Sequence, residues 1–308
     1  MRALVISGGG SKGAFAGGVA QFLIEQVAHE YDIFVGTSTG SLLISHLALN
    51  KVEKIKEVYT SVNQKSIFNS CPFLIKKDKF GGKQIAIDHF TVFRNFLKGK
   101  KTFGESYNLR KLIGKTITVE EFEKLKSTNK EVVVTVSNLS LNQVEYKSIR
   151  DFDYEDFLDW IWISSNYTPF MSLVKKDGCE YADGGFGSMV PIEEAINRGA
   201  TAIDVIVLET EIAYYNRLPS KNVFSLLTNI HNYMADRIEK QNIRIGKFAA
   251  SNKNVIINLY YTPTVLTTNS LIFDKKMMTK WWELGYQYAD QKNSELNEIR
   301  TQDDSLLV

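Results

Sequence analysis

Two apolar segments near the N-terminus each lead into a glycine turn and then into a helical pattern, and this repeated order restricts the fold more than any other feature. Ala3–Ser7 precedes the first glycine turn, and Ala14–Glu30 then shows apolar residues at helical spacing. Asp32–Val35 precedes the second turn, and Ser41–Leu49 follows as an apolar helix. Because strands without polar alternation are typical of parallel sheets covered on both faces, the order predicts an α/β fold with a central, mostly parallel sheet.

The remaining segments extend this pattern without a clear domain boundary or internal repeat. We expect further helices over residues 51–62, 119–125, 222–248 and 276–299, and further strands over residues 131–136, 143–148, 204–208 and 255–260. A chain of 308 residues, 44% of them hydrophobic, can fill one large core. We therefore predict a single domain over residues 1–300, followed by a loose tail over residues 301–308.

The first glycine turn, Gly8-Gly9-Gly10-Ser11-Lys12-Gly13, matches the G-x-G-x-x-G pattern of dinucleotide-binding folds. Such a fold needs an acidic residue at the end of the second strand, where it binds the ribose hydroxyls. That position carries Ser38, and Asp32 lies at the opposite end of the strand. Dinucleotide binding, which would appear as a rise in thermal stability on adding NAD or FAD, is therefore the weaker reading of this loop.

The second turn, Gly36-Thr37-Ser38-Thr39-Gly40, is a G-x-S-x-G sequence between a predicted strand and a predicted helix. This context is typical of a nucleophile elbow, in which the serine hydroxyl stands above the sheet at a helix N-terminus. The glycine loop is then free to act as an oxyanion hole. Its expected donors are the backbone N–H groups of Gly9, Gly10 and Ser11, together with that of Thr39.

None of the four histidines lies in a convincing place to act as the base for Ser38. His29 ends the first helix, and His46 lies two turns beyond the serine. His89 falls in a basic segment, and His231 lies within a long predicted helix.

A better candidate for the base is Asp183, in the stretch "EYADGGFGSMVP" at residues 180–191. It follows a short strand-like segment and precedes Gly184 and Gly185 on a turn. A turn aspartate before glycine is common by itself. The combination with Ser38 and the glycine loop favours a catalytic role.

Taken together, these three motifs resemble those of the patatin-like phospholipase family, which has G-G-G-x-[K/R]-G, G-x-S-x-G and D-G-[G/A] in this order. The resemblance extends over roughly residues 1–292 and includes "ISSNYTPFM" before the aspartate and "WWELGYQYA" near the C-terminus. The residues that support the motifs around the site are Gly8, Lys12, Gly13, Gly36, Gly40, Gly184 and Gly185.

The resemblance implies a three-layer α/β/α patatin-like fold and a Ser–Asp dyad without histidine. Ser38 would be the nucleophile and Asp183 the general base of a phospholipase A or lysophospholipase-type esterase that works through an acyl-enzyme, with no metal and no cofactor. Two alternatives stay open at this point. One is an α/β-hydrolase-type esterase with Ser38, Asp183 and His231, since the chain order fits. The other is a catalytically silent lipid-binding module.

Residues 76–115 differ in composition from the rest of the chain, with eleven Lys or Arg and interleaved phenylalanines. The segment is either a lid or membrane-facing surface, or a solvated basic face over a small satellite core. Lys12 likewise has two readings, because it could attract an anionic headgroup or orient the glycine loop from the surface.

Partners and location are only broadly indicated. The net charge of +2 is too small to indicate a nucleic-acid partner, so we expect no nucleic acid. We expect a lipid or acyl-ester substrate. Cys71 and Cys179 have no metal-binding spacing, which favours a reducing compartment. Met1 and Arg2 run directly into a strand, so we expect no signal peptide and a cytoplasmic protein that is at most peripheral to a membrane.

Overall fold

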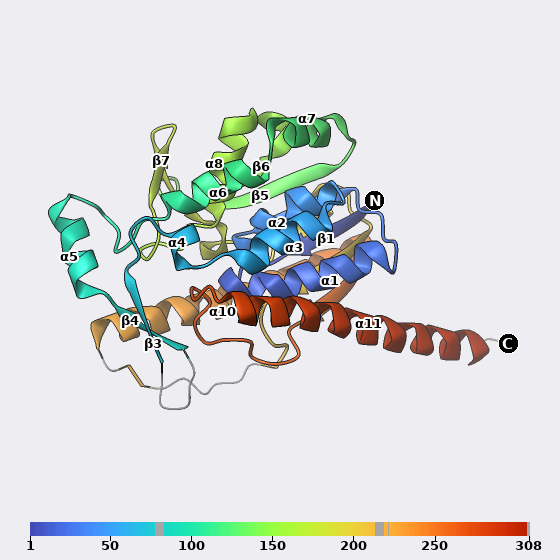
Figure 1. The fold of residues 1–308 in the computed structure, drawn as a ribbon. Helices are drawn as coiled ribbons and strands as arrows, with labels where there is room; N and C mark the ends of the chain where they lie inside the picture. The colour runs from blue at the N-terminus through green and yellow to red at the C-terminus, as the bar shows by residue number, and fades with distance from the viewer. Residues whose placement is uncertain (78–82, 213–218, 221, 307–308) are drawn as a thin grey trace.

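A central sheet of eight strands forms the middle of the molecule in the computed structural model, which describes residues 1–77, 83–212, 219–220 and 222–306 (Figure 1). The order is β10-β9-β1-β2-β5-β8-β7, with β6 paired to β5. Strands β10, β9, β1, β2 and β5 are parallel, as predicted for the centre of the sheet. Their bounds are β1 (Arg2–Ile6), β2 (Ile33–Thr37), β5 (Glu131–Asn138), β6 (Gln143–Ser148), β7 (Val174–Lys176), β8 (Cys179–Asp183), β9 (Ala202–Val207) and β10 (Ile256–Tyr261).

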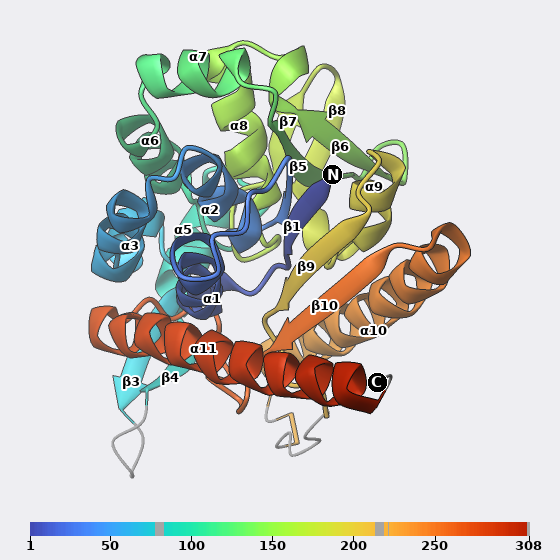
Figure 2. The same ribbon diagram turned by 90° about the vertical axis from the view of Figure 1, so that its right-hand side faces the viewer.

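Helices cover both faces of this sheet, which gives the three-layer α/β/α arrangement predicted from the sequence (Figure 2). Leu4 and Ile6 of β1 pack with α1, α2, α3, α8 and α11, whereas Ala3 and Val5 pack with α9 and α10. This alternation explains why the strand is apolar throughout. The helices are α1 (Gly13–Glu25), α2 (Thr39–Ala48), α3 (Val52–Ser61), α4 (Gln64–Ile67), α5 (His89–Leu97), α6 (Tyr107–Thr116), α7 (Val119–Ser127), α8 (Tyr154–Ser164), α9 (Ile192–Asn197), α10 (Val223–Lys253) and α11 (Lys275–Leu306).

The register of β5 brings the ends of β2 and β8 together. β6 pairs with Val133–Asn138 of β5. Each of these residues also pairs with either β2 or β8, so β6 lies along one edge of β5 and both other strands lie along the opposite edge. β2 and β8 therefore share one edge of β5. Along it, Thr135 pairs with Thr37 and the next residue, Val136, pairs with Asp183. The residue that follows β2 is thus placed beside the end of β8.

Three regions differ from the boundaries expected from the sequence. The first helix ends at Glu25 rather than at residue 30, because the chain turns at Ala28, whose φ is 55°. The basic segment contains the hairpin of β3 (Phe73–Lys77) and β4 (Lys83–Ile87), and then α5 and α6. Leu109 and Ile113 of α6 are buried in the main core, so this part is not a satellite.

At the C-terminus, α11 continues to Leu306, where the sequence analysis predicted a loose tail from residue 301. Residues 78–82 of the basic segment and residues 307–308 of that tail lie outside the described residues.

Candidate active site

Ser38 occupies a sharp turn between β2 and α2. Its φ of 54° and ψ of −117° lie outside the regions that most residues adopt, and it is partly exposed while its neighbours are buried. Gly40 permits this turn, because a Cβ at that position would overlap the carbonyl oxygen of Ile6. A Cβ at Gly36 would lie 2.5 Å from the carbonyl carbon of Gly40. The G-x-S-x-G sequence therefore forms the strand–turn–helix expected of a nucleophile elbow.

The carboxylate of Asp183 lies directly beside this serine. Ser38 Oγ donates to Asp183 Oδ2 over 2.6 Å, and the N–H of Gly185 donates to Oδ1 over 2.8 Å. Gly184–Phe186 form a short 3-10 turn after β8, which places the Gly185 N–H at the carboxylate. Asp183 is only 3% exposed. Burial raises the pKa of its carboxyl to about 7, while the two hydrogen bonds act in the opposite direction.

The glycine loop lies against the same turn. A Cβ on Gly8 would be 3.2 Å from Ser38 Cβ, and the Gly8 N–H donates to Met189 O over 3.2 Å. The carbonyl oxygen of Gly10 accepts from Thr39 Oγ1 at 2.8 Å and from Tyr59 OH at 2.6 Å. Side chains of α2 and α3 thus hold the loop in place beside the serine.

Two backbone N–H groups of this loop remain available. The carbonyl oxygen of Gly8 accepts from Ser7 Oγ, and that of Gly9 accepts from the Lys12 N–H. In a trans peptide the N–H points away from the carbonyl oxygen. The N–H groups of Gly9 and Gly10 therefore point away from these contacts, and no residue within the described ranges accepts from either.

Ser11 does not fit the prediction that its backbone N–H is a donor of the oxyanion hole. Its N–H donates to Ser270 O over 2.8 Å, so it is not free to bind an oxyanion. The N–H of Thr39 is in the first turn of α2, where backbone donors have no partner within the helix. Gly13 follows as the first residue of α1, with its backbone against Tyr59 OH and Thr39 Oγ1.

Sequence reasoning missed several residues that position the serine. Ser164 Oγ accepts from the Ser38 N–H over 2.9 Å, and Ser165 Oγ donates to Ser38 O over 3.1 Å. Both belong to the stretch "ISSNYTPFM" before Asp183, whose residues have no role that the sequence pattern alone indicates. Tyr59 lies in the helix predicted over residues 51–62. Nothing in the helical pattern distinguishes its hydroxyl, which reaches Gly10 O and Thr39 Oγ1.

Lys12 is buried rather than at the surface, and its ammonium group pairs with the carboxylate of Glu209 after β9. The nearby Glu239 of α10 is also buried. Burial and the negative charge of Glu209 raise the pKa of Glu239 to about 8, although the positive charge of Lys12 opposes this. The ion pair anchors the glycine loop to the segment after β9. Because the charge of Lys12 is buried and paired, it favours the interpretation that Lys12 orients the loop over the one that it attracts a headgroup.

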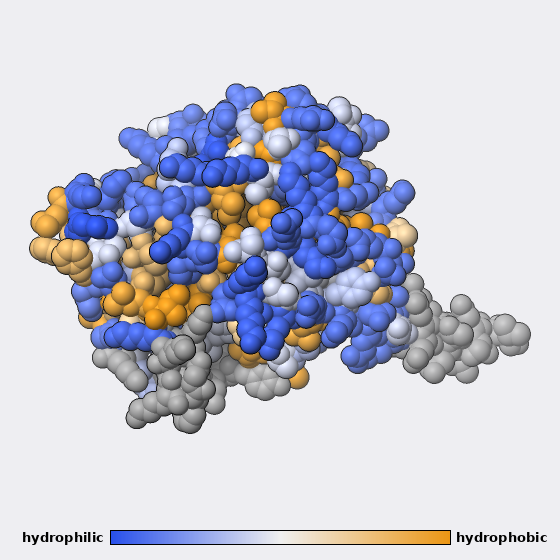
Figure 3. All heavy atoms as spheres, in the orientation of Figure 1, coloured by the Kyte–Doolittle hydropathy of each residue, from blue (hydrophilic) through white to orange (hydrophobic). Residues whose placement is uncertain are grey.

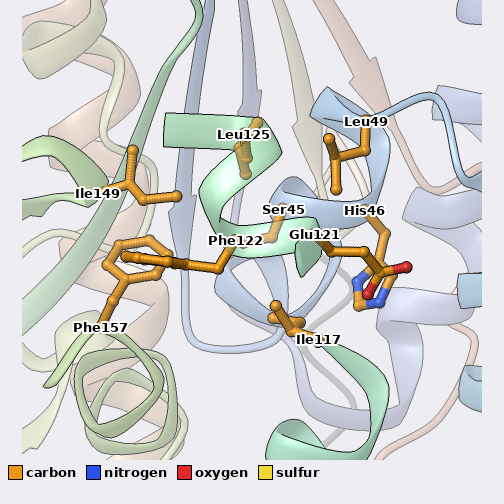
Figure 4. A pocket seen from close by; sticks show the side chains of 9 residues that line it. All are labelled: Ser45, His46, Leu49, Ile117, Glu121, Phe122, Leu125, Ile149 and Phe157. Atoms are coloured by element: carbon orange, nitrogen blue, oxygen red, sulfur yellow. The ribbon is translucent and has the colours of Figure 1, made fainter. Parts of the chain in front are cut away.

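The four histidines lie in other environments. His29 contacts Asp204 Oδ2, and the His89 ring contacts Phe224. His46 bonds to Thr116 O and lines a narrow cavity on the α7 side, together with Phe122 and Phe157 (Figure 4). Burial lowers the pKa of His46.

His231 Nδ1 bonds to Leu227 O within α10. The two hydrogen bonds to the Asp183 carboxylate come from Ser38 and Gly185, and no described contact joins His231 to either member of the Ser38–Asp183 pair. The structure therefore does not bring together the Ser38–Asp183–His231 triad.

A narrow apolar cavity of about 50 Å³ lies between α2, α3, α6 and α8. Its lining includes Leu42, one helical turn beyond Ser38, and the ring of Tyr59. Leu112 and Ile113 of α6 form the opposite wall. Ser38 and Asp183 are not among its lining residues, but Tyr59, which lines it, also holds the glycine loop.

Two further observations concern only the residues that the structure describes. Within them, no group of three or more His, Cys, Asp or Glu side chains is arranged to hold a metal ion. None of the described helices has both the length and the apolar character needed to cross a membrane.

The chain is similar to a curated protein and to a solved structure. The chain is 24% identical over 223 residues to the uncharacterized protein YjjU of Escherichia coli (strain K12), covering 69% of this chain and 53% of that protein. It thus spans about half the length of this curated relative. The solved structure of VipD from Legionella pneumophila gives a TM-score of 0.49 at 15% identity, covering 94% of this chain and 66% of that one.

The model of one protein family, described as patatin-like phospholipase, matches residues 4–196. This range covers more than half of the chain and includes both glycine turns and Asp183. The chain therefore belongs to the patatin-like phospholipase family.

Proposed function

We propose that this protein is a lipid acyl hydrolase of the phospholipase A or lysophospholipase type, with Ser38 as nucleophile and Asp183 as general base. Family membership supports acyl hydrolysis of lipids in general. The observation that supports the finer assignment is the 2.6 Å hydrogen bond from Ser38 Oγ to a buried carboxylate. A nucleophile and its base must lie within hydrogen-bond distance of each other for proton transfer.

In the proposed reaction, Ser38 Oγ attacks the ester carbonyl carbon while its proton passes to Asp183. The carbonyl oxygen becomes an oxyanion, which accepts hydrogen bonds from the N–H groups of Gly9 and Gly10 and from that of Thr39. Asp183 returns the proton to the leaving alcohol, and the C–O bond to that alcohol breaks to leave an acyl-enzyme. Water then gives a proton to Asp183 and attacks the acyl carbon. The bond from that carbon to Ser38 Oγ breaks, Asp183 returns the proton to Oγ, and the fatty acid is released.

The raised pKa of Asp183 suits this role. An aspartate with an ordinary pKa of about 3.9 is a weak base at neutral pH. Burial raises the pKa of Asp183 to about 7, which makes the carboxylate a better proton acceptor near neutral pH. Since the base must be deprotonated, kcat/KM should rise with pH through about 7.

The substrate class follows from the family and from the motifs. We expect a phospholipid, a lysophospholipid or another acyl ester, with the acyl chain entering between α2 and α6, where the narrow apolar cavity would have to widen to hold it. We assign the activity to one catalytic domain over residues 1–300, without a cofactor. Cys71 and Cys179 are both free thiols, which supports the expectation of a protein that acts from the cytoplasm.

The experiment compares wild type with Ser38→Ala, Asp183→Asn and His231→Ala on p-nitrophenyl butyrate and on a panel of phospholipids and lysophospholipids, in the presence of EDTA. We expect hydrolysis by wild type and by His231→Ala, and losses of 10³-fold or more, on the order seen for other nucleophiles and bases, in the two dyad variants.

Activity that survives Asp183→Asn but not His231→Ala would replace the dyad by a triad. A folded wild type that neither turns over these esters nor reacts with a fluorophosphonate would identify a silent lipid-binding module instead. Activity that EDTA abolishes and added metal restores would contradict the metal-independent route.

A further inference from the structure

Two neighbouring helices expose large apolar side chains, which are unfavourable in contact with water. The residues are Phe90, Phe93 and Leu97 of α5, and Val223, Leu226 and Tyr233 of α10, which together we call the α5–α10 surface. Phe90 and Leu97 are each 73% exposed, and Val223 is 78% exposed. Figure 3 shows apolar residues at the edge of the molecule where Figure 1 places α5. Contiguous exposed apolar patches mark interaction sites.

Helical spacing explains why these side chains share one face of each helix. Phe90, Phe93 and Leu97 are separated by three and four residues, as expected for one face. The two helices meet near their N-termini, because the ring centroid of Phe224 lies 5.5 Å from that of His89 and 5.3 Å from that of Phe103, which follows α5. The two exposed faces therefore belong to one joined structure.

A row of aromatic rings links this surface to the turn after Asp183. The ring centroid of Phe103 lies 5.7 Å from that of Phe170, which in turn lies 6.1 Å from the ring centroid of His231. His231 lies 6.1 Å from Phe186, which ends the 3-10 turn that follows Asp183. These contacts form a continuous row of packed rings from the exposed helices to the turn beside the candidate active site.

The charges around the surface favour an anionic partner. Arg94 and Lys98 of α5 and Lys76 of β3 are exposed, and none of them forms an ion pair within the described part of the chain. Asp88 caps the N-terminus of α5. The α10 sequence has no acidic residue from Asn222 to Ala235. Lys100 and Lys101 contribute less, because they pair with Glu105 and Glu180.

We propose that the α5–α10 surface docks the protein on an anionic phospholipid bilayer, with its aromatic and aliphatic side chains at the level of the acyl chains. Arg94 and Lys98 would contact the headgroups, and the aromatic row would lie on the path of a lipid to Ser38. Exposed apolar residues flanked by Lys and Arg are what interfacial binding requires. The delivery of lipid rests on the proposed hydrolase function, whereas the docking does not.

Docking is measured with Ser38→Ala protein, so that hydrolysis cannot alter the vesicles. The assay is co-sedimentation with vesicles of phosphatidylcholine alone and with added phosphatidylglycerol. We expect stronger binding to the anionic vesicles, a loss of tenfold or more with Phe93→Asp, and a loss of about fivefold with Arg94→Gln. The matched control is Val119→Asp, since Val119 is a 55% exposed apolar residue on the distant α7. Thermal melts check that each variant is folded.

The outcomes separate this proposal from the proposed function. Binding by Ser38→Ala that Phe93→Asp weakens and Val119→Asp does not would support docking, even if wild type failed to cleave any ester. Equal binding by both aspartate variants, or no binding to anionic vesicles, would overturn it. A dimer in solution that Phe93→Asp converts to a monomer would also overturn it, because the surface would then be covered by a second copy.

Discussion

Replacing Asp183 by asparagine is expected to abolish ester hydrolysis and, above neutral pH, to stabilise the folded protein. The carboxylate is 3% exposed, and within the described residues its hydrogen bonds come from the hydroxyl of Ser38 and the N–H of Gly185. Burial therefore penalises the charged form. Asparagine keeps an acceptor for Gly185 and a polar group beside Ser38 without that charge.

The magnitude follows from the pKa of Asp183. It is about 7 in the folded protein and 3.8 ordinarily. Between these values the unfolded chain loses the proton while the folded chain keeps it, so stability falls as pH rises and levels off above about 7. A pKa difference of about 3 corresponds to about 4 kcal/mol. The advantage of Asp183→Asn should grow from about 2 kcal/mol near pH 5.5 to about 4 kcal/mol near pH 8.5.

The assay is urea unfolding of both proteins at several pH values. Two variants serve as controls. Asp290→Asn makes the same side-chain change at an exposed position of α11 and should show no such trend. Ser38→Ala also lacks activity but keeps the buried carboxylate, so it should not be stabilised. A stability difference between wild type and Asp183→Asn that does not change with pH would refute the reasoning, since the buried charge would then carry no penalty.

Three other substitutions test the support of the site. Gly10→Ala should lower kcat by about 10²–10³-fold in the p-nitrophenyl butyrate assay. Gly10 has a φ of 56° and a Cβ there would overlap Ser270 O, so the substitution should displace the N–H of Gly10 from the oxyanion hole. An unchanged kcat would show that the loop takes no part in the reaction. Tyr59→Phe deletes the hydroxyl that holds Gly10 O and Thr39 Oγ1, so kcat should fall about fivefold at constant KM; a change in KM alone would point to substrate binding. Leu112→Trp should fill the apolar cavity and shift preference toward shorter acyl chains across p-nitrophenyl esters, whereas an unaltered chain-length profile would place the acyl chain elsewhere.

Much of this protein is determined by short stretches of its sequence. The apolar strands and the glycine turns at Gly8–Gly13 and Gly36–Gly40 are local patterns, because a buried parallel strand needs apolar residues on both faces and a sharp turn needs glycine. They predicted the layered α/β fold and the elbow at Ser38. The glycine turn after Asp183 indicated the candidate base, which the structure places 2.6 Å from Ser38 Oγ, and the family resemblance implied that the pair acts without histidine.

Other features depend on contacts that no local pattern records. The pairing of Thr37 and Asp183 with neighbouring residues of β5 brings the two motifs together across more than a hundred residues. Ser11 looked equivalent to Gly9 and Gly10, but its N–H is taken by Ser270, far along the chain. In the sequence, Tyr59 cannot be distinguished from any other buried aromatic residue, and only the structure shows that its hydroxyl donates to Gly10 O. The tertiary structure decided these roles, because hydrogen-bond partners and burial are set by residues that are distant in sequence.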